Sequence, residues 1–72
     1  ALALLNNSFL LDQSRFFAER LQQESRTTAG QVDRAFRLAF GRAPDAKEAQ
    51  AALNLIAKHG LTAFCRALLN AN

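Results

Sequence analysis

One stretch of this 72-residue chain, residues 32–48, restricts its fold more than any other. Apolar residues recur there every three or four positions, and a step of 100° per residue brings them onto one side of a helix. That side consists of Val32, Ala35, Phe36, Ala39 and Phe40, with Leu38 beside it. Gly41 ends this helix, because glycine readily adopts the left-handed conformation of a C-cap. Asp45 and Glu48 then have the spacing of a capping box, which predicts the start of another helix.

The remaining sequence has the same helical period and predicts an all-α fold. Half of the residues are hydrophobic, β-branched residues are few, and no segment alternates apolar and polar residues as a strand does. Three of the predicted helices run from about residue 9 to 23, from 46 to 59 and from 63 to 70. The remaining one is the central helix described above, which ends at residue 40. Their candidate caps are Asn6, Asn7 and Ser8 for the first helix, Thr28 with Gln31 for the second and Thr62 for the fourth. Because a chain of this length holds at most one domain, we expect residues 1–72 to form a single, small compact bundle of about four helices.

Each of the other helices has an apolar face that identifies its expected core residues. On the first helix the face consists of Leu10, Leu11, Ser14, Phe17, Ala18 and Leu21. On the third it consists of Ala49, Ala52, Leu53, Ile56 and Ala57, with Leu55 pointing the other way, and Gly60 ends the helix. On the fourth it consists of Phe64, Cys65, Leu68 and Leu69.

Phe9 and Phe16 form a second apolar stripe on the first helix, outside its core face. They are seven residues apart and therefore lie within about 20° of each other, flanked by Gln13 and Arg20. In one interpretation, residues 1–5 or the fourth helix fold over this stripe. In the other, Phe9, Phe16 and Arg20 form an interaction patch, since exposed apolar patches mark interfaces and are enriched in aromatic residues and arginine.

The sequence contains no motif of catalysis or cofactor binding. His59, the only histidine, is expected to be a cation near a helix C-terminus, and the single Cys65 a buried, unreactive thiol. The carboxylates on separate polar faces, expected to be solvated or ion-paired, are Asp12, Glu19, Asp33 and Glu48. We therefore predict no catalytic, cofactor-binding or metal-binding residue, and no enzymatic activity of this chain by itself.

Neither nucleic-acid binding nor membrane insertion is indicated. Residues 56–62 resemble the first half of a helix-turn-helix, but the next helix offers only one basic residue, Arg66, on a face suited to packing. The net charge of +3 is spread along the chain, and Arg34 with Arg37 would make a weak phosphate footprint. Residues 1–5 are apolar but too few to span a membrane or to act as a signal peptide.

Three parts of the chain form a recognisable pattern. They are residues 4–9 (Leu-Leu-Asn-Asn-Ser-Phe) with 17–21 (Phe-Ala-Glu-Arg-Leu), residues 36–44 (Phe-Arg-Leu-Ala-Phe-Gly-Arg-Ala-Pro) with Glu48, and residues 67–72 (Ala-Leu-Leu-Asn-Ala-Asn). Together they resemble the C-terminal part of a planctomycete-type domain family of unknown function, whose members are large exported proteins often fused to cytochrome-c-like modules. The resemblance implies an excised C-terminal fragment of a larger protein that is exported to the periplasm or cell surface. No haem-attachment motif occurs in this chain, so any haem chemistry would belong to other modules.

The residues and the resemblance together predict a non-catalytic structural or protein-interaction module. Its expected partners are the upstream domains of the parent protein or a second copy of the chain, without nucleic acid and without membrane insertion. One alternative is an accessory part of an enzyme or redox protein whose catalytic residues lie upstream. Another is a weak nucleic-acid-binding helical domain.

Overall fold

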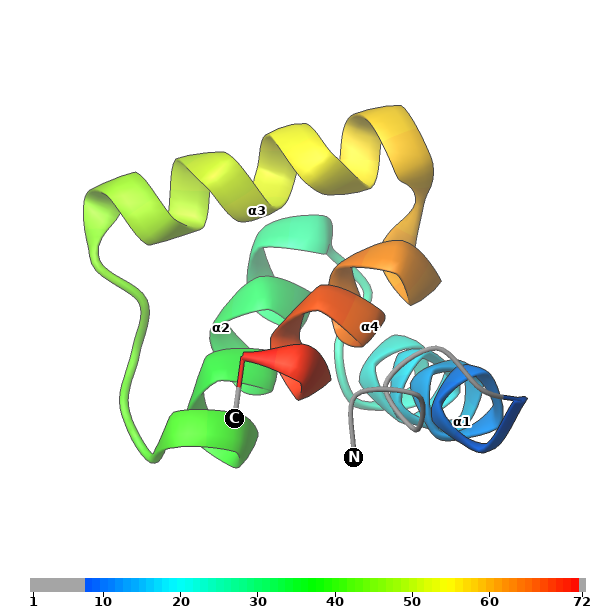
Figure 1. Cartoon of the computed structure of the whole chain (residues 1–72). Helices are drawn as coiled ribbons and strands as arrows, with labels where there is room; N and C mark the ends of the chain where they lie inside the picture. The colour runs from blue at the N-terminus through cyan, green and yellow to red at the C-terminus, as the bar shows by residue number, and fades with distance from the viewer. Residues whose placement is uncertain (1–7, 72) are drawn as a thin grey trace.

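A computed structural model describes residues 8–71, which form four α-helices and no strand. The helices are α1 (Ser8–Glu24), α2 (Thr28–Phe40), α3 (Ala46–His59) and α4 (Leu61–Asn70) (Figure 1). The predicted all-α bundle is therefore confirmed, and α3 has its predicted bounds. Of the candidate caps of the first helix, Asn6 and Asn7 lie outside the described residues, and Ser8 is already helical.

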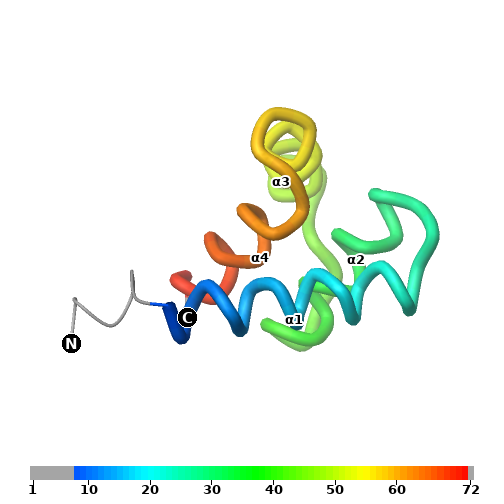
Figure 2. The backbone as a smooth tube through the Cα atoms, turned by 90° about the vertical axis from the view of Figure 1, so that its right-hand side faces the viewer, coloured from blue at the N-terminus to red at the C-terminus, as the bar shows by residue number. Residues whose placement is uncertain are grey.

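The helices cross, with α2 and α4 between α1 and α3. In Figure 1 α3 runs across α2 and α4 while α1 is seen end-on. In Figure 2, a quarter turn away, α3 is end-on and α1 runs along the opposite side of the molecule. α1 packs mainly against α4, and α3 packs against both α4 and α2. As a result, α1 and α3 each keep a broad face toward solvent.

The core forms where the inward faces of all four helices meet. Its buried hydrophobic residues are Ala18, Leu21, Val32, Ala35, Phe36, Ala52, Phe64, Cys65 and Leu68. The rings of Phe36 on α2 and Phe64 on α4 stack with their centroids 6.3 Å apart, an arrangement that stabilises beyond the area it buries. Ser14 is buried among these side chains, and its hydroxyl donates a hydrogen bond to the Leu10 carbonyl at 2.8 Å. The one buried polar side chain of residues 8–71 is thus satisfied.

The turn between α2 and α3 has the predicted structure. Gly41 adopts the left-handed conformation (φ 73°, ψ 18°), and its N–H donates to the Arg37 carbonyl. The Asp45 carboxylate accepts a hydrogen bond from the Glu48 N–H at 2.8 Å, and the Glu48 carboxylate accepts one from the Asp45 N–H at 2.9 Å. Both hydrogen bonds of the predicted capping box are present, so this prediction is confirmed.

The Arg42 side chain connects this turn to α3 and to two phenylalanine rings of α2. Its Nη1 and Nη2 atoms donate to the two carboxylate oxygens of Glu48 at 2.7 and 2.8 Å. The guanidinium carbon lies 5.9 Å from the ring centroid of Phe36 and 5.8 Å from that of Phe40. The hydrogen bonds from Arg42 and from the Asp45 backbone lower the pKa of Glu48 to about 2. Glu48, the N3 residue of the α3 capping box, therefore also holds a cation over the buried Phe36 ring.

The predicted cap of α2 is wrong by one residue. The N-cap is Thr27 in an extended conformation, and its hydroxyl accepts a hydrogen bond from the Gly30 N–H at 3.0 Å. Gln31 donates to the Ser25 carbonyl at 3.0 Å instead of forming a capping box with Thr28. Thr27 and Thr28 both carry a hydroxyl that can cap the helix. The spacing of Thr28 and Gln31 therefore does not identify which of the two is the N-cap.

The predicted cap of the fourth helix is also wrong. Gly60 alone separates α3 from α4, and its φ of 94° and ψ of 166° form a conformation that other residues avoid. Its N–H donates to the Ile56 carbonyl and ends α3, and its carbonyl accepts from the Phe64 N–H at 3.3 Å at the start of α4. Because α4 already begins at Leu61, Thr62 lies inside its first turn and no side chain caps it.

Three residues depart from the predicted apolar faces. Phe40 and Ala57 are exposed, although both were expected in the core. Phe40 is the last residue of α2, where fewer neighbours cover the helix. Leu55, expected to point away, is half-buried and packs against the core. Because α3 contacts two helices, its buried arc extends to both sides of Ala52 and turns away from Ala57.

Candidate functional site

The most exposed large hydrophobic residues of the described chain are on α1. Phe9 and Phe16 are 68% and 61% exposed, followed by Leu38 and Phe40 at 37% each. The fourth helix therefore does not cover the two phenylalanines, and residues 1–5, the other expected cover, lie outside the described residues. The structure places both rings on the surface of the described residues, outside the core face of α1.

Phe9 and Phe16 form part of the wall of an open groove of about 690 Å³, which we name the α1 groove. It is lined by Phe9, Leu10, Gln13, Phe16, Phe17 and Arg20 from α1, Leu38 and Ala39 from α2, and Leu69 from α4. Three of the four most exposed large hydrophobic residues, Phe9, Phe16 and Leu38, line this groove. The groove therefore gathers most of the large apolar side chains that the described core leaves outside, and Arg20 is the only charged residue among its described lining.

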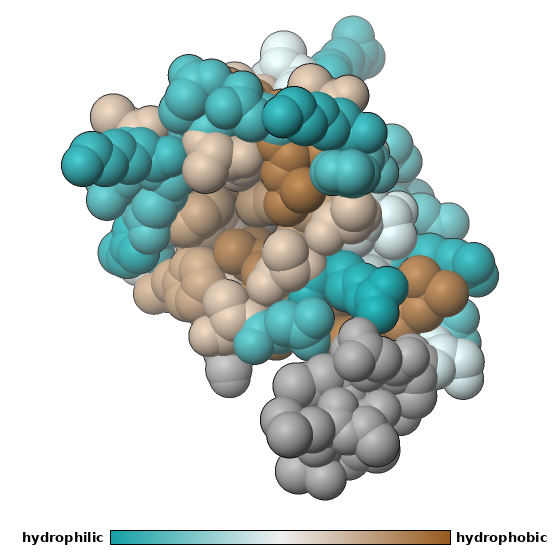
Figure 3. Space-filling model, turned by 45° about the horizontal axis from the view of Figure 1, so that its top comes forward, coloured by the Kyte–Doolittle hydropathy of each residue, from teal (hydrophilic) through white to brown (hydrophobic). Residues whose placement is uncertain are grey.

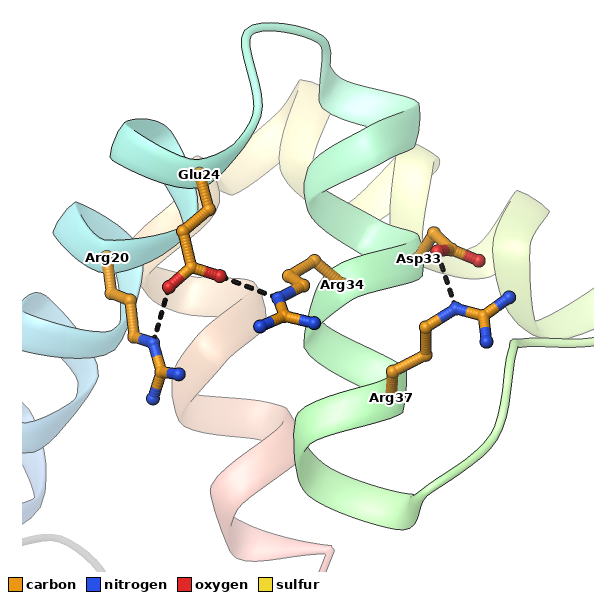
Figure 4. Close-up of polar contacts among 5 residues, drawn as sticks. All are labelled: Arg20, Glu24, Asp33, Arg34 and Arg37. Carbon is orange, nitrogen blue, oxygen red and sulfur yellow. Dashed lines mark hydrogen bonds and ion pairs between the residues drawn. The ribbon is translucent and has the colours of Figure 1, made fainter.

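Arg20 belongs to an ion-pair network between α1 and α2 (Figure 4). Its Nε atom donates to Glu24 Oε2 at 2.7 Å, and the Nε atom of Arg34 donates to Glu24 Oε1 at 2.6 Å. The hydrogen bonds from Arg20 and then from Arg34 hold the pKa of the Glu24 carboxyl below its usual value, so this carboxylate stays ionised. Exposed ion pairs add little stability. The main consequence is that one carboxylate fixes the direction of two arginine side chains.

The predicted interaction patch, which consists of Phe9, Phe16 and Arg20, therefore lies together along one wall of the α1 groove. A helical period was sufficient to bring these residues together, because all of them are on one helix. Their exposure could not be read from the period, since it depends on where the other helices pack. Their role in binding stays a prediction.

Sequence reasoning missed the residues that other helices contribute to this site. Leu38 and Leu69 complete the lining from α2 and α4. The four-residue spacing of Arg20 and Glu24 is typical of an ion pair on a helix and could have been noticed. No spacing links Glu24 to Arg34, because ten residues and a turn separate them.

Three of the residues considered for chemistry in the sequence, Cys65, His59 and Asp33, lie in separate environments. Cys65 is fully buried, and burial raises the pKa of its thiol to about 12, so the reactive thiolate does not form near neutral pH. His59 is exposed in the last turn of α3, and Asp33 is ion-paired with Arg37 at 2.8 Å. Within residues 8–71 no three His, Cys, Asp or Glu side chains are grouped as the ligands of a metal ion would be.

A second and smaller apolar groove, of about 240 Å³, lies between α3 and α4. Figure 3 looks onto this side of the molecule, where apolar side chains surround a hollow. The groove is lined by Phe36, Glu48, Ala51, Ala52, Leu55, Phe64, Ala67, Leu68 and Ala71. Its only charged lining residue, Glu48, is already paired with Arg42. It therefore offers no unpaired charge that would select a ligand.

The fold and the α1 groove define a small all-helical module with an exposed apolar surface. A family profile described as "PSD1: Protein of unknown function (DUF1553)" matches residues 1–56, which include α1, α2 and most of α3. The chain belongs to this family. The resemblance to a domain family of unknown function is thus confirmed, whereas the planctomycete origin and the fusion to cytochrome-c-like modules stay predictions.

Comparison with proteins of curated function gave no match, and neither did comparison with solved structures. Among the helices of residues 8–71, none combines the length and the apolar character that crossing a bilayer requires.

Proposed function

We propose that this chain is a non-catalytic structural and protein-interaction module that docks through the α1 groove. The observation that supports the proposal is the exposure of Phe9 and Phe16 beside a groove that three helices line. The core of residues 8–71 forms without these two rings, so packing among the described helices does not account for them. Contiguous apolar surface with a polar surround is typical of a protein interface.

Covering this surface would stabilise a complex. Removing a phenylalanine side chain from water is worth roughly 1.5–3 kcal/mol, and the groove presents two such rings with Leu38 on the opposite helix. A few anchor residues carry most of the free energy at protein interfaces, and arginine is enriched among them. Phe9, Phe16 and Arg20 have the composition of such an anchor set.

The partner that we propose is the upstream part of the parent protein, with a second copy of the chain as the other candidate. The resemblance of the sequence supports a module of a larger protein and export of that protein to the periplasm or cell surface. Arg37 is engaged by Asp33 of the same chain, which weakens the phosphate footprint that Arg34 and Arg37 would form together and supports a protein partner over nucleic acid.

The variant Phe16→Glu tests this proposal. It puts a charge on the groove wall while leaving the core untouched, so we expect unchanged helicity and melting temperature. We expect the variant to lose association with the upstream part of the parent protein or with itself. Circular dichroism melts and analytical ultracentrifugation measure the two properties. The control Gln22→Glu adds the same charge to an exposed site of α1 outside the groove and should leave both unchanged.

Two results would contradict the proposal. Unfolding of the domain by Phe16→Glu would show that Phe16 belongs to the core. A folded variant that associates as the parent does would show that the α1 groove is not the docking surface.

A further inference from the structure

The ion-pair network beside the α1 groove indicates the chemistry of the groove's partner. Arg20 and Arg34 use their Nε atoms to hold Glu24. Their Nη atoms make no hydrogen bond or ion pair with any other residue of the described range. In Figure 4 these atoms lie on the side of the carboxylate that faces the C-terminal end of α2. Two guanidinium groups are thus held near each other with their Nη donors available to a further carboxylate.

Arg20 lines the groove, and Arg34 holds the same Glu24 carboxylate from α2 next to it without being part of the lining. Arg20 follows Phe16 by one helical turn on α1, and Arg34 precedes Leu38 by one turn on α2. Phe16, Arg20 and Leu38 all line the groove. A segment that lies along the groove would therefore contact apolar side chains over most of its length and the arginines at its end.

The spacing of the groove residues on α1 favours a helix as the occupant. Phe9, Gln13, Phe16 and Arg20 are separated by four, three and four residues, which is the spacing of the seam between two packed helices. From Phe9 to Arg20 the helix rises ~16 Å, which matches about three turns of a partner helix. An amphipathic helix binds such a groove through anchors at positions i, i+3 or i+4, and i+7.

We propose that the α1 groove binds an amphipathic helix of another protein segment, in which an Asp or Glu next to the apolar stripe pairs with Arg20 and Arg34. This inference rests on the docking function proposed above and specifies its partner. Each arginine offers a planar set of donors that fits a carboxylate. The apolar stripe of the partner would cover Phe9 and Phe16.

Charge selects such a partner over a second copy of the chain. Two guanidinium groups (+2) and the Glu24 carboxylate (−1) leave the network with a net charge of +1, and the whole chain carries +3. Two copies that meet through the same surface would each bring a net positive network to the contact, and neither network would supply the excess carboxylate that the other lacks. An acidic helix would neutralise the network instead, and complementary charge favours association.

A peptide selection tests the inference. A displayed library of helix-forming peptides of about 16 residues, or somewhat more than four turns, is selected on the parent chain and counter-selected on Phe16→Glu. The expected clones carry an apolar stripe flanked by Asp or Glu rather than by Lys or Arg. Their binding should be about fivefold weaker to Arg20→Gln/Arg34→Gln, because two partly exposed ion pairs are lost. Arg37→Gln removes a similarly exposed arginine of α2 that is paired with Asp33, and should bind them as the parent does.

The results distinguish this inference from the docking function on which it rests. Clones that require Phe16 but show no excess of acidic residues would overturn the acidic-helix inference and leave the docking function in place. Equal binding of the clones to the parent and to the double arginine variant would do the same. If no helical binder of the parent is recovered, the acidic-helix inference fails alone, and if every recovered binder also binds Phe16→Glu, both proposals fail.

Discussion

Two pairs of phenylalanines occupy opposite environments in this small protein. Phe36 and Phe64 are 6% and 4% exposed and stack on each other in the core, whereas Phe9 and Phe16 are 68% and 61% exposed along one helix. The four side chains have the same hydrophobicity, so composition does not separate them. The difference shows that α1 carries two apolar faces, one that packs in the core and one that the other described helices leave uncovered.

Truncation of a buried ring should have the largest effect on stability. Phe36→Ala removes a ring that contacts Phe64 and lies under Arg42, and such truncations cost ~3–5 kcal/mol of unfolding free energy. Phe9→Ala removes the same atoms from the surface and should change stability by no more than about 0.5 kcal/mol. Chemical denaturation measures both variants. Equal stability of the two variants would contradict the assignment of Phe36 to the core and of Phe9 to the surface.

Gly60, the one-residue connection that positions Phe64 of α4 against Phe36, should be the next most sensitive site. At φ 94° and ψ 166°, Gly60→Ala forces a side chain into a strained conformation at a cost of roughly 1–3 kcal/mol. Gly41→Asn is the control, because asparagine tolerates the left-handed conformation at φ 73° and ψ 18°. We expect a smaller loss of melting temperature for Gly41→Asn. A Gly60→Ala protein with the same melting temperature as the parent would show that the Gly60 conformation does not constrain α4.

Removal of the α3 cap should have a smaller, local effect. Asp45→Ala loses the side-chain hydrogen bond to the Glu48 N–H, which typically costs ~1 kcal/mol. Amide hydrogen exchange should accelerate in the first turn of α3 and stay unchanged along α1, which bears the exposed pair. Unchanged exchange at the start of α3 would contradict the role given to the capping box.

Acid should lower the stability of the core around Phe36, the buried member of the comparison. The pKa of Glu48 is about 2 in the folded protein against an ordinary value of 4.5. A pKa lowered by folding contributes stability that is present above pH 4.5 and is lost as the pH falls toward about 2. The loss should loosen Arg42 from the ring of Phe36. The unfolding free energy of Glu48→Gln should fall less over this interval than that of the parent. Identical pH profiles of the two proteins would contradict a stabilising role of the Arg42–Glu48 ion pair.

Much of the fold was predictable because its boundaries are set by local chemistry. Gly41, and Asp45 with Glu48, mark helix ends through their own backbone and hydrogen-bonding preferences, and the structure has each in its predicted place. The choice between Thr27 and Thr28 as a cap was not predictable, because both residues offer the same hydroxyl.

The candidate site was predictable only where a single helix forms it. Phe9 and Phe16 share a side of α1 for reasons of helical period alone. The contributions of Leu38 and Arg34 depend on how α2 crosses α1, and no pattern within one helix contains that information. The half-buried position of Leu55 has the same origin, because α3 packs against two helices at once.

Fluorine NMR of the chain with fluorophenylalanine at all six phenylalanine positions tests the central claim most directly. A soluble paramagnetic agent broadens the signals of rings that water can reach, and single Phe→Leu variants assign the signals. We predict strong broadening for Phe9 and Phe16 and none for Phe36 and Phe64. Addition of the upstream part of the parent protein should then protect Phe9 and Phe16 alone. The account is contradicted if Phe9 and Phe16 are shielded in the isolated chain, or if they are broadened equally with and without that partner.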